Sequence, residues 1–186
     1  MRPLLVVEDI HAPTRKRLFT FGGVSVEATR YAWLAVPGYI AVGVLFAALG
    51  RFGGSLSTAL LTGSALGAGL YLTNSIHSLG HIVAGRIVGS PMDVLLLTAT
   101  RDVTLYASTT GSPTKRARIV RSLGGPVFNL LAGAAAFAAA VIFTSEWVRF
   151  LSLANVAVGL WTLCPVPTLD GWVIWGQIFG DRHRNA

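Results

Sequence analysis

The sequence is poor in charged residues: Asp, Glu, Lys and Arg together make up 12% of its 186 residues. That share is about half of what a soluble domain usually carries. Hydrophobic residues make up 53%, and the mean hydropathy is +0.62, which indicates a membrane protein. Acids are scarce, with 8 against 15 Lys and Arg. The net charge of +7 does not indicate a nucleic-acid partner, because the cations gather at the ends of apolar runs, as membrane topology requires.

Cysteine is almost absent as well. Cys164 is the only one, which excludes an intramolecular disulfide and a CxxC metal or redox site. The first thirty residues contain no continuous apolar segment, because Glu8, Asp9 and a basic cluster interrupt them, so we expect no cleavable signal peptide. We find no internal repeat, which disfavours a transporter built from repeated halves.

Four apolar stretches predict an all-α polytopic membrane protein with about four transmembrane helical segments. They cover residues 31–50, residues 55–88, residues 123–143, and a fourth segment over 150–163 that continues, beyond two prolines, over 169–179. As one helix, residues 55–88 would be about 51 Å long at 1.5 Å per residue. That helix must tilt, break near residues 67–69 or extend beyond the bilayer. Pro37 and Gly38 should kink the first stretch or mark an early turn.

Two regions between these stretches are β-prone. Residues 18–26, around Gly22 and Gly23, predict a hairpin at the membrane surface, and residues 92–108 predict two short strands. We therefore expect one membrane-embedded domain over residues 1–186, with residues 1–30 as an N-terminal cytoplasmic segment.

The distribution of Lys and Arg predicts the orientation in the membrane. Five lie in residues 1–30, five in residues 92–121 and two near the C-terminus, whereas the two opposite loops hold only Arg51 and Arg149. Cytoplasmic loops carry the excess of Lys and Arg. We therefore expect an even number of spans, both termini in the cytoplasm, and the small β element on the cytoplasmic side.

His77 and His81 lie four residues apart in a segment with almost no other polarity. On a helix this spacing puts both imidazoles on one face, about 5–6 Å apart at Cβ, where both can reach one metal ion. Asp170 lies in the apolar C-terminal region, where a carboxylate costs about 2.5–3.5 kcal/mol at membrane depth unless it has a partner. Two histidines and a carboxylate with an open fourth position form a catalytic type of zinc site. The sequence thus predicts zinc at His77, His81 and Asp170.

Simpler interpretations of the same residues stay open. Asp170 alone would fit a solvated loop at the membrane interface, and Gly125-Pro126 would fit the first turn of a helix. A single histidine could hold a haem or another pigment in a membrane subunit. Two histidines on one helical turn cannot bind opposite faces of one haem, and a pigment leaves Asp170 without a role.

Taken together, the motifs resemble those of the site-2 proteases, which are intramembrane zinc metalloproteases. The family carries H-E-x-x-H on one helix, G-P-x-x-N on the next and an N-x-x-P-x-P-x-L-D-G pattern later; here residues 77–81, 125–129 and 162–171 follow in that order. The stretch F-G-G-V-S-V at 21–26, followed by a span, is also similar to small bacterial members. The resemblance covers nearly the whole chain and leaves no room for a PDZ or CBS domain.

The resemblance implies a site-2-protease-like core in the inner membrane of a bacterial cell. It implies that His77, His81 and Asp170 are the zinc ligands and that Asn129 lies near the active site. It also implies that the sheet formed by residues 92–108 pairs with an unwound segment of a transmembrane substrate, through main-chain hydrogen bonds at its edge.

Three departures from the family pattern affect the expected function. Ser78 replaces the glutamate that acts as general base, Thr162 replaces the usual Asn, and Trp172 replaces a second Gly. A serine hydroxyl is not a base at neutral pH, and loss of a general base typically costs about 10²–10⁴-fold in rate. We therefore expect a catalytically impaired relative that binds a transmembrane partner in the bilayer or serves as a subunit of a larger membrane complex. An active protease that cleaves transmembrane substrates is the alternative.

Overall fold

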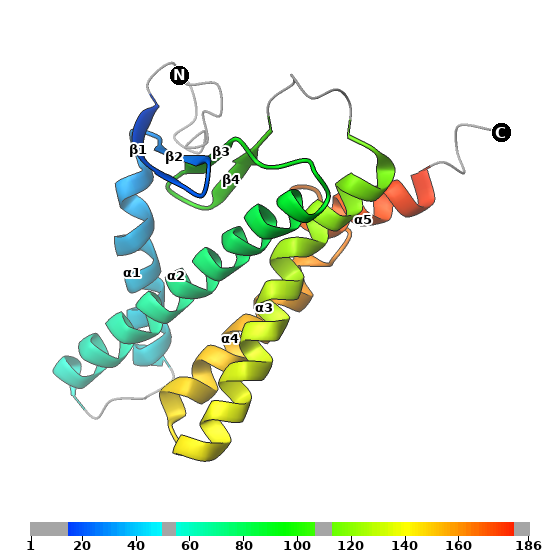
Figure 1. Cartoon of the computed structure of the whole chain (residues 1–186). Helices are drawn as coiled ribbons and strands as arrows, with labels where there is room; N and C mark the ends of the chain where they lie inside the picture. The colour runs from blue at the N-terminus through cyan, green and yellow to red at the C-terminus, as the bar shows by residue number, and fades with distance from the viewer. Residues whose placement is uncertain (1–14, 50–54, 107–112, 181–186) are drawn as a thin grey trace. The chain divides into compact units, whose positions relative to one another are not determined.

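Helices make up most of the chain in the computed structural model, which describes residues 15–49, 55–106 and 113–180 (Figure 1). The elements are, in order, β1 (Lys16–Phe21), β2 (Val24–Ala28), the short 3-10 helix η1 (Ala32–Leu34), α1 (Ala35–Leu49), α2 (Leu56–Ile87), β3 (Val94–Leu97), β4 (Asp102–Leu105), α3 (Lys115–Phe143), α4 (Glu146–Thr162) and α5 (Asp170–Phe179). The expected hairpin and both expected strands are present in these positions, although residues 107–108 lie outside the described part.

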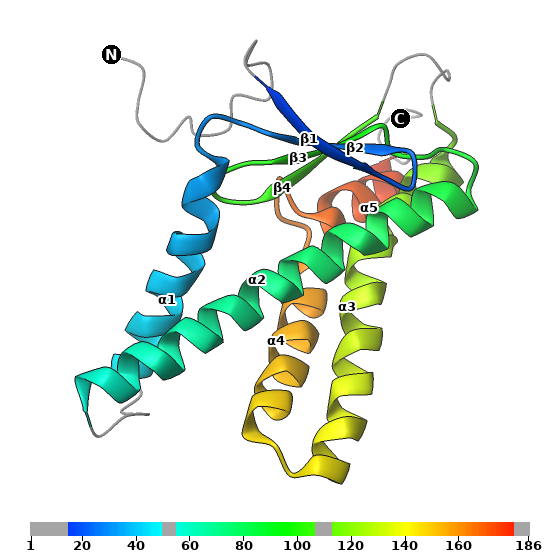
Figure 2. The ribbon, with the colours of Figure 1, turned by 60° about the vertical axis from the view of Figure 1, so that its left-hand side comes forward.

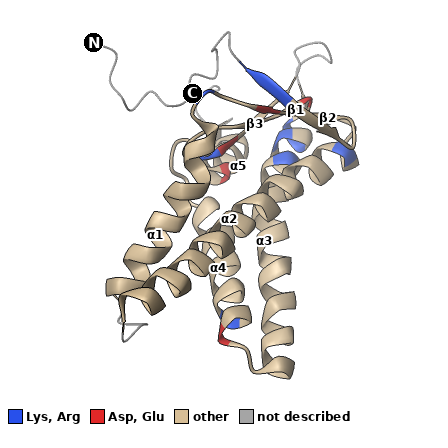
Figure 3. Ribbon diagram, turned by 90° about the vertical axis from the view of Figure 1, so that its left-hand side faces the viewer, with Lys and Arg blue, Asp and Glu red and all other residues tan. Residues whose placement is uncertain are grey.

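Within the described residues, three helical segments are long and apolar enough to cross a membrane: Ala32–Leu49, Leu56–Ile87 and Lys115–Phe143. In Figure 3 the charged residues of these helices gather at helix ends, because Arg86 lies in the last turn of α2 and the cations of α3 lie in its first two turns. These helices indicate an integral membrane protein. The fourth expected segment is divided, because the turn that contains Pro165 and Pro167 separates α4 from α5. At 17 residues, α4 is about 26 Å long, somewhat short of a hydrocarbon core of about 30 Å.

The part of the chain that the structure describes thus contains three candidate spans by length and composition, and the fourth span remains a prediction. The orientation also remains a prediction. Four of the cations on which it depends, together with both chain ends, lie outside the described residues: Arg2, Arg51, Arg182 and Arg184.

The prolines and glycines act differently in the three long helices. α2 runs unbroken through residues 67–69, so of the expected alternatives a break there is excluded. Pro37 stands in the first turn of α1, directly after η1, which agrees with an early turn rather than a mid-helix kink. Pro126, in contrast, lies in the interior of α3, which begins eleven residues earlier at Lys115.

The chain divides into two compact units, and the boundary falls inside α2 between Asn74 and Ser75. One unit comprises Met1–Asn74 and Asp93–Leu105, and the other comprises Ser75–Met92 and Tyr106–Ala186. A single domain over residues 1–186 accordingly remains a prediction. The first unit holds the four-stranded sheet, with the strand order β1-β2-β3-β4 (Figure 2).

Two antiparallel hairpins are joined side by side in this sheet. β1 pairs with β2 and β3 pairs with β4, whereas β2 and β3 run parallel, with Val26 opposite Leu95. Val24, Val26 and Leu96 are almost completely buried. The parallel pairing of two segments so distant in the sequence makes the N-terminal hairpin part of one sheet with residues 94–105.

In the same unit, α1 and α2 are in backbone contact. A Cβ added at Gly67 of α2 would lie only 2.6 Å from the Cα of Ile40 in α1, so no larger residue fits without moving a helix. The rings of Tyr39 and Tyr71 meet edge to face with centroids 5.7 Å apart. Further along α2, the side-chain amide of Asn74 donates a 2.9 Å hydrogen bond to Oδ2 of Asp102 in β4.

In the second unit, α3 packs along α4 and also contacts α5. Thr114 caps α3 by accepting a hydrogen bond from the backbone N–H of Ala117. The Ser152 hydroxyl of α4 donates a 2.8 Å hydrogen bond to the carbonyl of Gly133 in α3, inside the helix pair. Small residues and a polar cross-link are the usual means of helix association in membranes.

Candidate metal centre

Two side chains of the centre come from successive turns of α2. His77 and His81, four residues apart, project from one face of this helix, as their spacing predicts. Their rings meet edge to face with centroids 4.7 Å apart, and the two Nε2 atoms are separated by 3.1 Å. His81 is buried at 7% exposure, and the His77 side chain is 14% exposed.

The third side chain comes from the first residue of α5. Asp170 follows the turn after Pro165 and Pro167 and stands where the helix begins, so its carboxylate extends from the helix N-terminus. A Cβ at the next residue, Gly171, would collide with the backbone carbonyls of Leu163 and Cys164. Glycine at 171 therefore lets the start of α5 lie against the end of the preceding segment.

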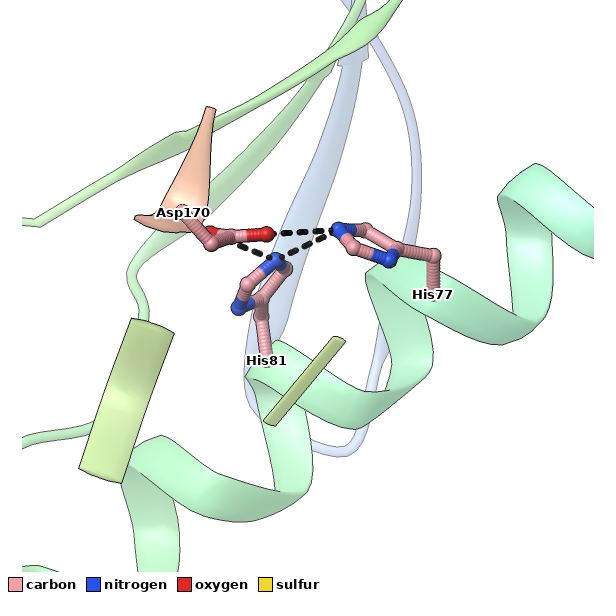
Figure 4. Close-up of side chains that lie close together, drawn as sticks. All are labelled: His77, His81 and Asp170. Atoms are coloured by element: carbon pink, nitrogen blue, oxygen red, sulfur yellow. Dashed lines mark hydrogen bonds and ion pairs between the residues drawn. The ribbon is translucent and has the colours of Figure 1, made fainter. Parts of the chain in front are cut away.

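The three side chains converge, as Figure 4 shows. Oδ2 of Asp170 lies 2.9 Å from Nε2 of His77, and Oδ1 of the same carboxylate lies 3.4 Å from Nε2 of His81. One ligand atom from each residue lies within 4.8 Å of the others. The structure thus brings together the three residues that were predicted as zinc ligands.

A backbone carbonyl fixes the orientation of His81. Its Nδ1 lies 2.8 Å from the carbonyl oxygen of Arg121 in α3. Because a carbonyl can only accept, Nδ1 carries the proton and Nε2 keeps the lone pair that a metal needs. Nδ1 of His77 is buried without such a partner among the described residues. The ring of His81 is therefore oriented by a backbone hydrogen bond through Nδ1, whereas that of His77 is not.

The Arg121 side chain is itself held by two contacts. Its guanidinium lies over the ring of Tyr106, 3.1 Å from the centroid, and Nη1 donates a 3.0 Å hydrogen bond to Oγ of Ser90. The sequence does not predict that the Arg121 carbonyl orients His81, because every residue type carries a backbone carbonyl.

Glycines allow α3 to approach the histidines. A Cβ added at Gly125 would lie 2.6 Å from Nε2 of His81 and 2.5 Å from Cε1 of His77. One residue earlier, a Cβ at Gly124 would lie 2.6 Å from the Cβ of Ala84 in α2. Gly125 had been identified only as part of the G-P motif, and the structure shows that any side chain there would occupy the space of the imidazoles.

The remaining predicted residues differ in their placement. Asn129 lies one helical turn after Gly125, is completely buried, and has no hydrogen-bond partner for either side-chain polar atom among the described residues. Ser78 is also buried, at 4% exposure, next to His77 in the sequence of α2. The Thr162 hydroxyl is engaged with the carbonyl of Val158 in its own helix, and the Trp172 side chain is 54% exposed.

The donor set fits zinc. Two imidazole nitrogens and one carboxylate are a usual three-ligand set of catalytic zinc sites, and a backbone carbonyl that orients one ligand is a usual second partner. The Nε2 atoms of the two rings lie 3.1 Å apart and both face the Asp170 carboxylate, so one cation could be reached by all three side chains. A pigment ligated by either histidine would instead have to displace the Asp170 carboxylate from that ring.

Comparison with known proteins bears on the fold of the chain. No family model matches the chain, and no curated protein matches it. Among solved structures, the chain is similar to the Site-2 Protease from Methanocaldococcus jannaschii, with a TM-score of 0.66 and 19% sequence identity over 91% of this chain and 74% of that one. At this identity the likeness concerns the fold alone. The chain is thus a mostly helical membrane protein with a site-2-protease-like fold.

Proposed function

We propose that this chain is a zinc-binding, site-2-protease-like membrane protein that holds a transmembrane partner and cleaves it very slowly or not at all. The observation that carries the proposal is the convergence of His77, His81 and Asp170 beside a serine in the position of the family's glutamate. A zinc ion bound there would supply Lewis-acid polarisation of a peptide carbonyl.

The residues of the chain support binding better than turnover. The Arg121 carbonyl holds His81 in the tautomer that leaves Nε2 available. Asn129 offers a buried amide whose donor and acceptor are both unsatisfied, and buried polar groups normally have partners. Ser78 can donate or accept a hydrogen bond but cannot take up a proton at neutral pH. The chain therefore keeps its candidate zinc ligands, while the proton transfer needed for hydrolysis lacks its base.

His77 and His81 lie in a helix that is long and apolar enough to cross a membrane, which favours a partner that is itself embedded in the bilayer. The edge of the sheet offers main-chain groups for pairing with an unwound segment, and such pairing would not depend on the partner's sequence. We propose that the protein acts in this way alone or as a subunit of a larger membrane complex in a bacterial inner membrane.

An active protease is the second candidate, because the complete ligand set and the unsatisfied Asn129 would also serve hydrolysis. One assay separates the two. The purified protein in vesicles is incubated with a panel of single-span substrates, with and without a zinc chelator. Cleavage that the chelator and His77→Ala both abolish would establish a protease. An intact partner that co-purifies, without product after long incubation, is the expected result.

A further inference from the structure

The N-terminal strand β1 exposes three large apolar side chains. Leu18, Phe19 and Phe21 are 47%, 57% and 54% exposed, and every residue of this strand is exposed. Edge strands of soluble proteins normally avoid such a surface, because it invites association. A contiguous apolar strip of this kind marks an interaction surface.

The register shows that this strip continues the buried face of the sheet. Phe19 pairs with Val26 and Phe21 pairs with Val24, and residues directly opposite in antiparallel strands share one face. Val24 and Val26 are 1% and 4% exposed. The apolar face therefore extends beyond the buried part of the sheet and ends on β1, where its side chains are about half exposed.

The opposite face of the same hairpin is polar. Thr20 pairs with Ser25, and Arg17 pairs with Glu27. Arg17 also donates a hydrogen bond to the Thr20 hydroxyl, and Ser25 donates one to Glu27. The hairpin is thus amphipathic across its thickness, with aromatic rings on one face and hydrogen-bonded polar groups on the other.

The hairpin is tied closely to the first apolar helix of its unit, as Figure 2 shows. β2 ends at Ala28, and the apolar segment Ala32–Leu49 begins after only three further residues. The backbone N–H of Thr29 still donates to the carbonyl of Leu97, which holds this connection on the sheet. Three extended residues reach about 10–11 Å at most. The hairpin must therefore lie near the level at which this helix enters the membrane.

Charge and aromatic residues at this level match a lipid surface. Described residues 15–34 hold four cations, Arg15, Lys16, Arg17 and Arg30, against one acid, Glu27. Tyr31 and Trp33, at 44% and 67% exposure, follow directly, and the Arg30 guanidinium lies 5.6 Å from the centroid of the Tyr31 ring. Basic residues beside exposed aromatic rings are typical of segments in the headgroup layer of anionic membranes.

We propose that the β1–β2 hairpin lies flat in the membrane interface, with Phe19 and Phe21 against the acyl boundary and the basic residues on anionic phospholipid headgroups. The rival occupant is a strand from a second copy, paired with the outer edge of β1. The register shift between Arg17 and Phe19 and the two cations at the start of β1 disfavour such pairing.

Spin-label accessibility in vesicles tests this placement on the full chain. Cys164 is replaced by serine, and a nitroxide is attached to a single cysteine introduced by Phe19→Cys or, as a matched control on the opposite face, by Thr20→Cys. In vesicles of phosphatidylcholine and phosphatidylglycerol, the label at 19 should meet oxygen more readily than a water-soluble nickel complex, and the label at 20 should show the reverse. Equal access of the nickel complex to both labels would overturn the proposal.

A second arm addresses the headgroups and the rival occupant. Omission of phosphatidylglycerol, or Lys16→Gln together with Arg17→Gln, should move the label at 19 toward water. No movement in either case would overturn the role of anionic lipid. Spectral broadening that disappears on dilution with unlabelled protein would instead establish pairing between copies and overturn the proposal. Phe21→Cys, on the same face as Phe19, provides a second reporter if one labelled variant fails to fold.

Discussion

Nε2 of His77 and Oδ2 of Asp170 lie 2.9 Å apart, and this contact joins the interior of α2 to the first residue of α5. The same carboxylate reaches His81 through its other oxygen, at 3.4 Å. Asp170 is therefore shared between the two histidines. Without it, two imidazoles would face each other with no anion to balance a bound cation.

Asp170→Asn should accordingly weaken zinc binding while leaving the size of the side chain unchanged. Loss of an outer partner of a ligand already costs about 10–100-fold in metal affinity, so loss of a ligand should cost at least about 100-fold. Competition with a fluorescent zinc chelator measures the affinity. Glu146→Gln is the control, since Glu146 pairs with Arg149 at an exposed position. Equal affinities of the two variants would contradict the assignment of Asp170.

Gly125→Ala should also reduce zinc affinity, although glycine offers no ligand. The added methyl would lie 2.6 Å from Nε2 of His81, so either the ring or α3 must move. Gly176→Ala is the matched control, because a Cβ there meets nothing within 4 Å. Zinc affinity and thermal stability are measured together for both variants. A Gly125→Ala protein that binds zinc as tightly as the Gly176→Ala protein would show that the close approach has no role.

Trp175→Phe tests whether α5 must be held in place for Asp170 to reach the histidines. Nε1 of Trp175 donates a 2.9 Å hydrogen bond to the carbonyl of Leu163, which fastens α5 to the end of α4. A typical hydrogen bond contributes about 0.5–1.5 kcal/mol, so a loss of up to about tenfold in zinc affinity is expected. Trp172→Phe, at an exposed position, should have no effect. Identical zinc titrations for both variants would exclude the tether.

Ser78→Glu should introduce peptide cleavage, because it restores a general base next to His77 in α2. General bases contribute about 10²–10⁴-fold to rate, and a gain within this range over the unsubstituted protein is expected. Ser78→Ala should leave the residual rate unchanged. Product is followed by mass spectrometry of a single-span substrate in vesicles. If Ser78→Ala reduced an existing activity, Ser78 itself would take part in the reaction.

Much of the centre was predictable because the type and spacing of its side chains are visible in the sequence. The spacing of His77 and His81 predicts a shared helix face, and the apolar surroundings of Asp170 predict a partner for its carboxylate. The resemblance to the site-2 proteases assigns all three residues to one zinc site. The N-terminal hairpin and the two strands in residues 92–108 were also predictable, since β-prone residues flank Gly22 and Gly23 and occur again after residue 92.

Other features depend on the tertiary structure and leave no such signal. The Arg121 carbonyl that orients His81 is a backbone group that every residue type possesses. The contact of Gly125 with both imidazoles depends on how closely two helices approach, and the parallel pairing of β2 with β3 depends on contacts between distant segments. Whether α2 would break or run on could not be decided from its glycines, because Gly67 serves the contact with α1 rather than a bend.

The central claim is that His77, His81 and Asp170 hold zinc, and the zinc content of the purified protein tests it most directly. Elemental mass spectrometry of the unsubstituted protein and of a His77→Ala, His81→Ala double variant, purified side by side without chelator, gives zinc per chain. The unsubstituted protein should carry about one zinc per chain, as a single three-ligand site requires, and the variant should carry almost none. Equal zinc contents in the two proteins would contradict it.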